Sequence, residues 1–119
     1  MYRTIEEGVE LFNDLDFFAA HDFFENLWMN AESKDRLFYQ GMVQISVGSY
    51  HLLNKNFKGS LNQYKKGTNK LENYVPDYKG IELDILLEKI HNLITDLELY
   101  LSSGEIEIKT NKIPSIKKI

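Results

Sequence analysis

Hydrophobic residues recur at helical spacing along most of the chain. In the first segment, residues 4–13, the side chains of Ile5, Val9 and Phe12 are placed at i, i+4 and i+7, which puts them on one face of a helix. Four further segments show similar stripes and are predicted as helices: residues 17–29, 35–53, 57–74 and 80–101. The pattern predicts an all-α protein, a bundle of five helices.

Residues that favour helix ends separate these segments. Thr4 and Glu7 have the spacing of a capping box, and Asp16 is a good N-cap for the second helix. Pro76 is predicted to end the fourth helix, because proline has no backbone N–H to continue the hydrogen-bond ladder. Residues 102–104, Ser-Ser-Gly, end the fifth.

The C-terminal residues have no helical pattern. Isoleucines first alternate with charged residues and then continue at wider spacing around Pro114. This favours an extended strap packed on the bundle, and a frayed chain end is the alternative. We therefore expect a single domain over residues 1–119, with a helical core over about 4–102 and an extended tail over 104–119.

Seven positions in the first half of the chain have counterparts 40 residues later. Each copy has a glycine, a large apolar residue, a polar turn, an aromatic residue, a small residue and a second aromatic residue. The pairs are Gly8 and Gly48, Phe12 and Leu52, Asp14 and Asn54, Asp16 and Asn56, Phe17 and Phe57, Ala20 and Ser60, and Phe24 and Tyr64. The repeat predicts two stacked helical hairpins, similar to tetratricopeptide repeats, followed by a long C-terminal helix.

Composition excludes several classes of protein. The 119 residues carry 14 basic and 18 acidic side chains, a net charge of −4, so we do not expect general electrostatic binding to nucleic acid. Without cysteine there is no disulfide framework, thiolate metal site or thiol nucleophile. The chain has no apolar run of membrane-spanning type and no leader pattern near residue 1, so we expect a cytoplasmic protein without membrane contact.

The charges are separated along the sequence. Residues 1–35 contain nine acidic and two basic side chains, whereas residues 55–70 contain five lysines and no acidic residue. Lysines at this spacing are typical of a solvated helix face. They would also suit an acidic or phosphorylated partner.

The third predicted helix is unusual because residues 37–54 contain no charged side chain. This predicts a helix that is buried on most sides. Gln40, Gln44 and His51 fall near one another on one side of it. An unpaired buried polar group costs about 1–3 kcal/mol, so we expect hydrogen-bond partners across a helix interface.

The second helix offers such partners. His21 and Glu25 are i, i+4 neighbours and Trp28 follows one turn later. If the second and third helices pack side by side, His21 and Glu25 would meet Gln44 and His51. One interpretation is a buried, satisfied polar network that fixes helix register. The other is an acid–base or metal site, because a His–Glu pair can orient a proton and two imidazoles with a carboxylate suit a divalent cation.

The same residues resemble a known family. The pattern is Ala-His-x-x-x-Glu-x-x-Trp on one helix and Phe-x-Gln-Gly-x-x-Gln with a later His on the next. The matching residues are Phe12, Asn13, Ala20, His21, Glu25, Trp28, Phe38, Gln40, Gly41, Gln44, His51, Asn56, Gly59 and Ser60. Over residues 8–72 or so the chain is similar to the domain-of-unknown-function 309 family of small bacterial and archaeal proteins. The resemblance implies an all-α fold, and it implies no activity.

Two classes of function follow from these observations. The first is a protein or peptide interaction module, which would bind its partner in a groove between the hairpins or on the lysine face. The alternative is a hydrolase-like or metal-binding enzyme, with a divalent metal as its cofactor. Its catalytic or metal-ligating candidates are His21, Glu25 and His51, and its ligand-binding candidates are Trp28, Gln40 and Gln44.

Overall fold

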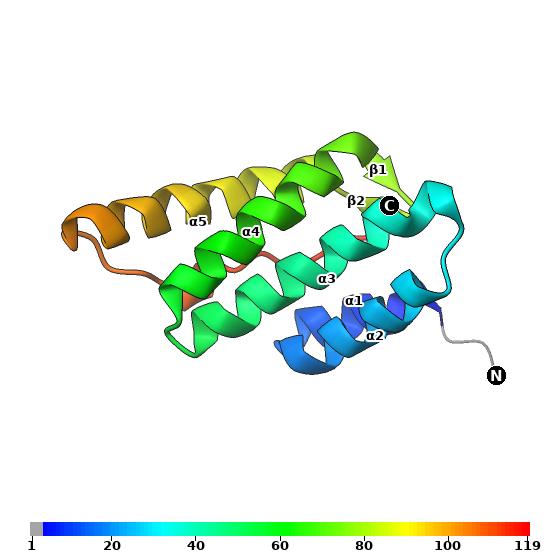
Figure 1. Cartoon of the computed structure of the whole chain (residues 1–119), viewed down its shortest axis with the longest axis horizontal. Helices are drawn as coiled ribbons and strands as arrows, with labels where there is room; N and C mark the ends of the chain where they lie inside the picture. The colour runs from blue at the N-terminus through cyan, green and yellow to red at the C-terminus, as the bar shows by residue number, and fades with distance from the viewer. Residues whose placement is uncertain (1–3) are drawn as a thin grey trace.

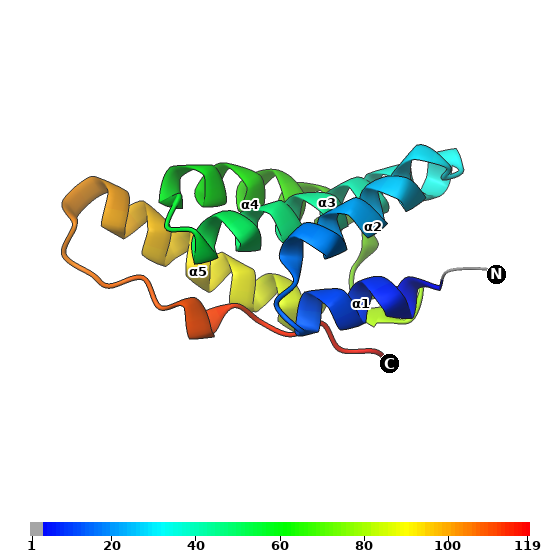
Figure 2. The ribbon, with the colours of Figure 1, turned by 90° about the horizontal axis from the view of Figure 1, so that it is seen from below.

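The computed structural model describes residues 4–119 and arranges their helices in two layers (Figures 1 and 2). The α-helices of this part of the chain are α1 (Ile5–Asn13), α2 (Phe17–Met29), α3 (Ser33–Leu53), α4 (Phe57–Leu71) and α5 (Asp84–Ser103). In Figure 2, helices α2, α3 and α4 form one layer, and α1, α5 and the C-terminal tail form the other. The prediction of five helices is confirmed. No helix of the described residues is long and apolar enough to span a membrane.

The two N-terminal hairpins have the same turn. Leu15 and Lys55 both have positive φ, at 66° and 61°. The next residues, Asp16 and Asn56, accept a capping hydrogen bond from the backbone N–H three positions later, at 3.3 and 3.0 Å. Four backbone hydrogen bonds of the first turn also have counterparts in the second, 40 residues on. The repeated hairpin is therefore confirmed, and its likeness to tetratricopeptide stacking stays a prediction.

Helix α3 is central because it contacts both α2 and α4. Glycines let α3 and α4 approach closely. A Cβ atom on Gly41 would lie 2.8 Å from the Leu71 side chain, and one on Gly67 would lie 2.8 Å from Ile45. The buried hydroxyl of Ser49 donates to or accepts from the Tyr64 hydroxyl at 2.7 Å, and it also bonds its own helix. Charged side chains are excluded from this contact because backbones this close leave them no route to water.

One sequence prediction was wrong between α4 and α5. The fourth α-helix ends at Leu71 and continues only as a 3₁₀ turn, η1 (Glu72–Tyr74). A two-stranded antiparallel hairpin then follows, β1 (Asp77–Tyr78) and β2 (Ile81–Glu82), where the fifth helix was expected to begin. Its two turn residues, Lys79 and Gly80, have φ of 50° and 79°, as two-residue hairpin turns require. The hydrophobic stripe continues through Ile81, so helical spacing alone could not locate this break.

The helix ends also differ in detail from expectation. Thr4 is the N-cap of α1, but its side chain makes no capping hydrogen bond, so the predicted capping box does not form. Helix α3 begins at Ser33, two residues before its predicted start, and α5 runs two residues further than predicted. At the start of α5, the amide N–H of Ile85 donates a hydrogen bond of 3.0 Å to the Glu82 carboxylate, which stabilises the first turn of this helix.

The tail is an extended strap, as predicted. It runs beneath α5 and passes α1, as Figure 2 shows, with one 3₁₀ turn at η2 (Thr110–Lys112). The Asn13 side chain holds it by accepting from the N–H of Ile116 at 2.7 Å and donating to its carbonyl at 2.9 Å. Ile116 is buried, and the backbone of Lys118 forms an isolated antiparallel β-bridge with Ile81 of β2. The strap thus closes the core between α1, α5 and the hairpin.

The repeat generates a stability prediction at Ser60. Its hydroxyl is buried and has no hydrogen-bond partner among the described residues, while the equivalent position in the first hairpin is the buried Ala20. Replacing Ser60 by Ala should raise the free energy of unfolding by about 1 kcal/mol, because an unsatisfied buried hydroxyl is removed. Denaturant unfolding measures the change. The reciprocal variant Ala20→Ser should lower the same quantity, and a loss of stability in Ser60→Ala would contradict the interpretation.

Candidate functional site

His21 lies between two carboxylates on the exposed side of α2. Its Nε2 is 3.1 Å from Glu25, one turn further along the helix, and its Nδ1 is 3.3 Å from Asp22. The side chain of His21 is 24% exposed and that of Glu25 is 46% exposed. The predicted His–Glu pair is therefore present, but it borders solvent and is not a buried network.

A small apolar pocket adjoins this pair, at the contact between α2 and α3. It has a volume of about 180 Å³ and is lined by Phe18, His21, Val47, Tyr50 and His51. The Phe18 ring packs edge-on against both His21 and Tyr50, with centroids 5.7 and 5.8 Å apart. His51 Nδ1 lies 3.4 Å from the Asn56 amide nitrogen. Tertiary structure thus brings the two histidines to one pocket, although they are 30 positions apart.

The three predicted binding residues lie outside this pocket. The Gln44 amide oxygen accepts a hydrogen bond of 2.8 Å from Lys70, so it faces α4. The Trp28 ring, two turns along α2 from His21, carries the Arg36 guanidinium 5.1 Å above its centre. Gln40 is half-buried on α3. The helix projection grouped these residues by angle, whereas their distance along the helix axes separates them.

The arrangement of the ionisable side chains does not suit a metal centre. Within residues 4–119, no group of three or more His, Asp or Glu side chains could hold a metal ion. His21, Glu25 and His51 therefore do not form the three-ligand site considered from the sequence. Since both ring nitrogens of His21 already face carboxylates, its imidazole is held in place and not presented to a ligand.

Comparison with protein families matches residues 5–63 to a domain of unknown function, DUF309. Residues 5–63 are a DUF309 domain. All of the motif residues that carried the resemblance, from Phe12 to Ser60, lie inside this range. A comparison with curated proteins finds no relative that matches the chain. The DUF309 domain covers α1 to α3 and the first part of α4, while the β-hairpin, α5 and the strap follow it.

A second polar cluster connects the DUF309 domain to the β-hairpin, and it was missed from the sequence. The buried carboxylate of Asp35 on α3 accepts a hydrogen bond of 2.5 Å from the Tyr78 hydroxyl and pairs with Lys79 at 3.2 Å. The Tyr78 hydrogen bond lowers the pKa of Asp35, and the same bond raises the pKa of Tyr78 to about 12. In the sequence, Asp35 resembles any acidic residue in the first turn of a helix. Its partners Tyr78 and Lys79 could not be identified because the hairpin that carries them was not predicted.

This cluster makes the stability of the protein depend on pH. The charged Asp35 stabilises the fold, so its contribution is lost as the pH falls from about 4 through its lowered pKa. The neutral Tyr78 hydroxyl stabilises it too, and that contribution is lost as the pH rises from about 10 to about 12. Tyr78→Phe should therefore cost most near neutral pH and progressively less at both extremes, as measured by urea unfolding across the range.

The matched control is Tyr74→Phe. The Tyr74 hydroxyl donates to the backbone carbonyl of Lys34 at 3.0 Å, and a carbonyl does not titrate. The cost of this substitution should stay constant from about pH 3 to pH 9, because its acceptor, a backbone carbonyl, carries no charge to gain or lose. An equally constant cost for Tyr78→Phe would show that Asp35 is not its partner in solution.

Proposed function

We propose that the protein is an interaction module that binds a peptide segment of a partner protein in the groove between its two hairpins. One apolar side chain of the segment would fill the pocket lined by Phe18, His21, Val47, Tyr50 and His51. The observation that carries the proposal is the exposure of the aromatic walls: Phe18 is 56% and Tyr50 is 39% exposed. We also propose that the two hairpins stack as tetratricopeptide repeats do, because that stacking places a binding groove between consecutive hairpins.

The size of the pocket supports a single anchoring side chain. Its volume of about 180 Å³ corresponds to roughly six water molecules, which is comparable to one Leu or Phe side chain. Fully burying such a side chain contributes about 1.5–3 kcal/mol. An anchor of this kind gives modest affinity by itself, so flanking contacts must contribute.

The charge at the rim favours a basic flank. Asp16, Asp22 and Glu25 are carboxylates on or next to the α2 wall, and Asp22 is 63% exposed. On the α3 side of the pocket, the lysine nearest in sequence to His51 is Lys55, in the turn after α3. A segment with an apolar anchor between Lys or Arg residues would thus be complementary to the α2 side.

A second candidate, an acid–base enzyme, has one observation in its favour. Glu25 orients His21 at 3.1 Å beside an open pocket that also holds His51. Such a site would act through His51, since no partner of its Nε2 is found in residues 4–119. The interaction module is the better supported function because the pocket lining otherwise offers only one phenol and apolar side chains.

The proposal can be tested with a fluorescein-labelled synthetic peptide that has one Leu between pairs of Lys. We expect fluorescence anisotropy to show binding that is weakened about tenfold in Phe18→Ser, because one apolar wall of the pocket is lost. The matched control is Met29→Ser on the same helix, where an equally apolar and 65% exposed side chain lies away from the pocket. This control should bind the peptide as the natural protein does.

Three further measurements separate the alternatives. A peptide with Ser for Leu should lose binding, and one with Glu for Lys should bind more weakly. Equal affinity for all three peptides would overturn the proposal. Hydrolysis of nitrophenyl esters and phosphates that disappears in His51→Gln would instead support the enzyme.

A further inference from the structure

We propose a second binding surface, the groove between α4 and α5, and assign it to an acidic amphipathic helix of a partner protein. The surface is separate from the pocket between α2 and α3, so the inference does not rest on the function proposed above. It is carried by three observations: an apolar groove, an uncovered helix end and a lysine rim.

The groove has a volume of about 610 Å³, more than three times that of the α2–α3 pocket. Leu61 of α4 forms one wall. The lining side chains of α5 are Thr95, Glu98, Leu99, Leu101 and Ser102. Four of these five are spaced i, i+3, i+4 and i+7, so they form one continuous stripe along the helix.

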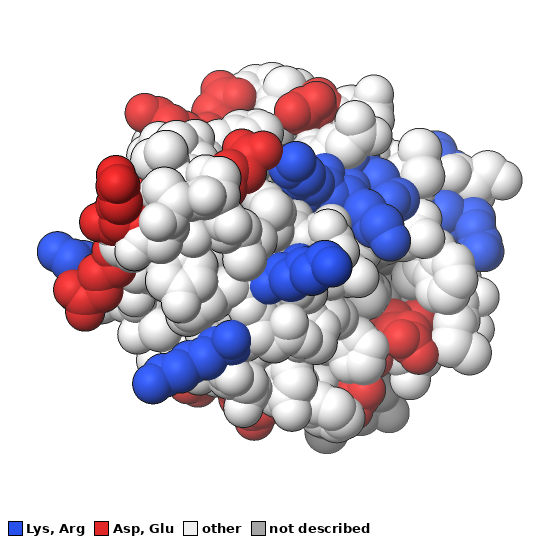
Figure 3. Space-filling view, turned by 60° about the vertical axis from the view of Figure 1, so that its left-hand side comes forward, with Lys and Arg blue, Asp and Glu red and all other residues white. Residues whose placement is uncertain are grey.

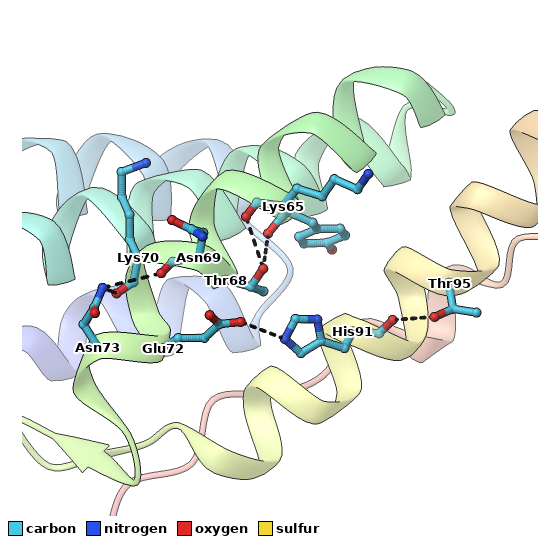
Figure 4. A network of polar contacts seen from close by, with 9 residues as sticks. Lys65, Thr68, Asn69, Lys70, Glu72, Asn73, His91 and Thr95 are labelled. Carbon is cyan, nitrogen blue, oxygen red and sulfur yellow. Dashed lines mark hydrogen bonds and ion pairs between the residues drawn. The ribbon is translucent and has the colours of Figure 1, made fainter.

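Contacts between α4 and α5 limit the groove. At one end His91 pairs with Glu72 at 3.5 Å, just after the end of α4. Figure 4 shows this pair spanning the two helices, with Thr95 one turn further along α5 and Lys65 on α4. Lys65 reaches across and pairs with Glu98 at 3.1 Å. The apolar groove therefore lies along the part of α5 that follows His91.

The last turns of α5 extend past the start of α4, as both Figure 1 and Figure 2 show. No other helix covers this end in the described residues, and Leu99 and Leu101 are 46% and 45% exposed. The ring of Tyr100 contacts Phe57 of α4, which fixes the direction of the overhang. Both leucines line the groove, although they are two residues apart and lie on different sides of α5.

The rim next to Leu61 is basic. Lys58 and Lys65 are three and four residues from Leu61, which places them about 60° and 40° from it around the helix. Lys65 pairs with Glu98 of α5, whereas Lys58 is exposed and has no ion pair among the described residues. Figure 3, with this end of the molecule turned forward, shows basic side chains gathered on one part of the face.

An acidic helix fits these features better than other partners do. A partner helix with leucines at i, i+3, i+4 and i+7 has one apolar face, which can pack on Leu61, Leu99 and Leu101. Its acidic face would then meet Lys58 and would compete with Glu98 for Lys65. Nucleic acid is disfavoured because neither α4 nor α5 has an arginine.

The probe is a synthetic peptide of about 14 residues, long enough for some four helical turns, with leucines at these positions and Glu elsewhere. A basic peptide carries Lys in place of Glu. We expect the acidic peptide to bind the full chain at least about tenfold more tightly than the basic one. The double variant Lys58→Glu and Lys65→Glu should reverse this preference, and Leu101→Asp should weaken both peptides.

The matched controls lie on the same two helices. Lys66→Glu makes the same charge change on α4, but it lies about 140° around the helix from Leu61. Ile85→Asp introduces a charge at a 44% exposed position in the first turn of α5, far from the groove. Both controls should keep the preference for the acidic peptide, and thermal unfolding of each variant checks that its fold is intact.

Four results would overturn the assignment. The first is equal binding of the two peptides, and the second is a set of amide shifts of the ¹⁵N-labelled protein that map to the α2–α3 pocket. The third is binding to anionic lipid vesicles that the acidic peptide does not displace. The fourth is a dimer that forms without peptide and that Leu101→Asp converts to a monomer. The last result would identify a second copy of the chain as the occupant of the groove.

Discussion

The close approach of α3 to α4 is the constraint on which the rest of the structure depends. Gly41 and Gly67 face each other's helices so tightly that a methyl group at either position would collide with a core side chain. Backbones at this distance cannot accommodate charged side chains, which is why α3 is uncharged over its last 17 residues. With α3 fixed against α4, its opposite flank is left for α2, and the pocket forms along that second contact.

The turn that is repeated in the two hairpins determines where the ends of α2 and α3 lie. Because Asp16 and Asn56 cap their helices in the same way, both hairpins leave their turns in the same conformation. His51 is one turn before the second of these turns, and Phe18 is directly after the first. The two turns thus bring the ends of α2 and α3 that carry His21 and His51 to one place. The pocket lies at the contact between two similar hairpins.

Charge differs between the two proposed surfaces. The α2 side of the first pocket carries carboxylates, whereas the groove between α4 and α5 has Lys58 and Lys65 on its rim and Glu98 in its lining. A net charge of −4 conceals this separation. The two proposed surfaces share no lining residue, so a partner on one would not occupy the other.

The helices, the repeat and the central place of α3 could be predicted from the sequence, because periodicity, caps and the lack of charge are local signals. The sequence also singled out His21, Glu25 and His51. Helix packing places His21 and His51 at one pocket, and it places Gln44 against Lys70 and Trp28 against Arg36. The tertiary structure also establishes the hairpin and the partnership of Asp35 with Tyr78, 43 positions away. Angle around a helix can be calculated from sequence, whereas the alignment of one helix against another depends on packing of residues that are distant in the chain.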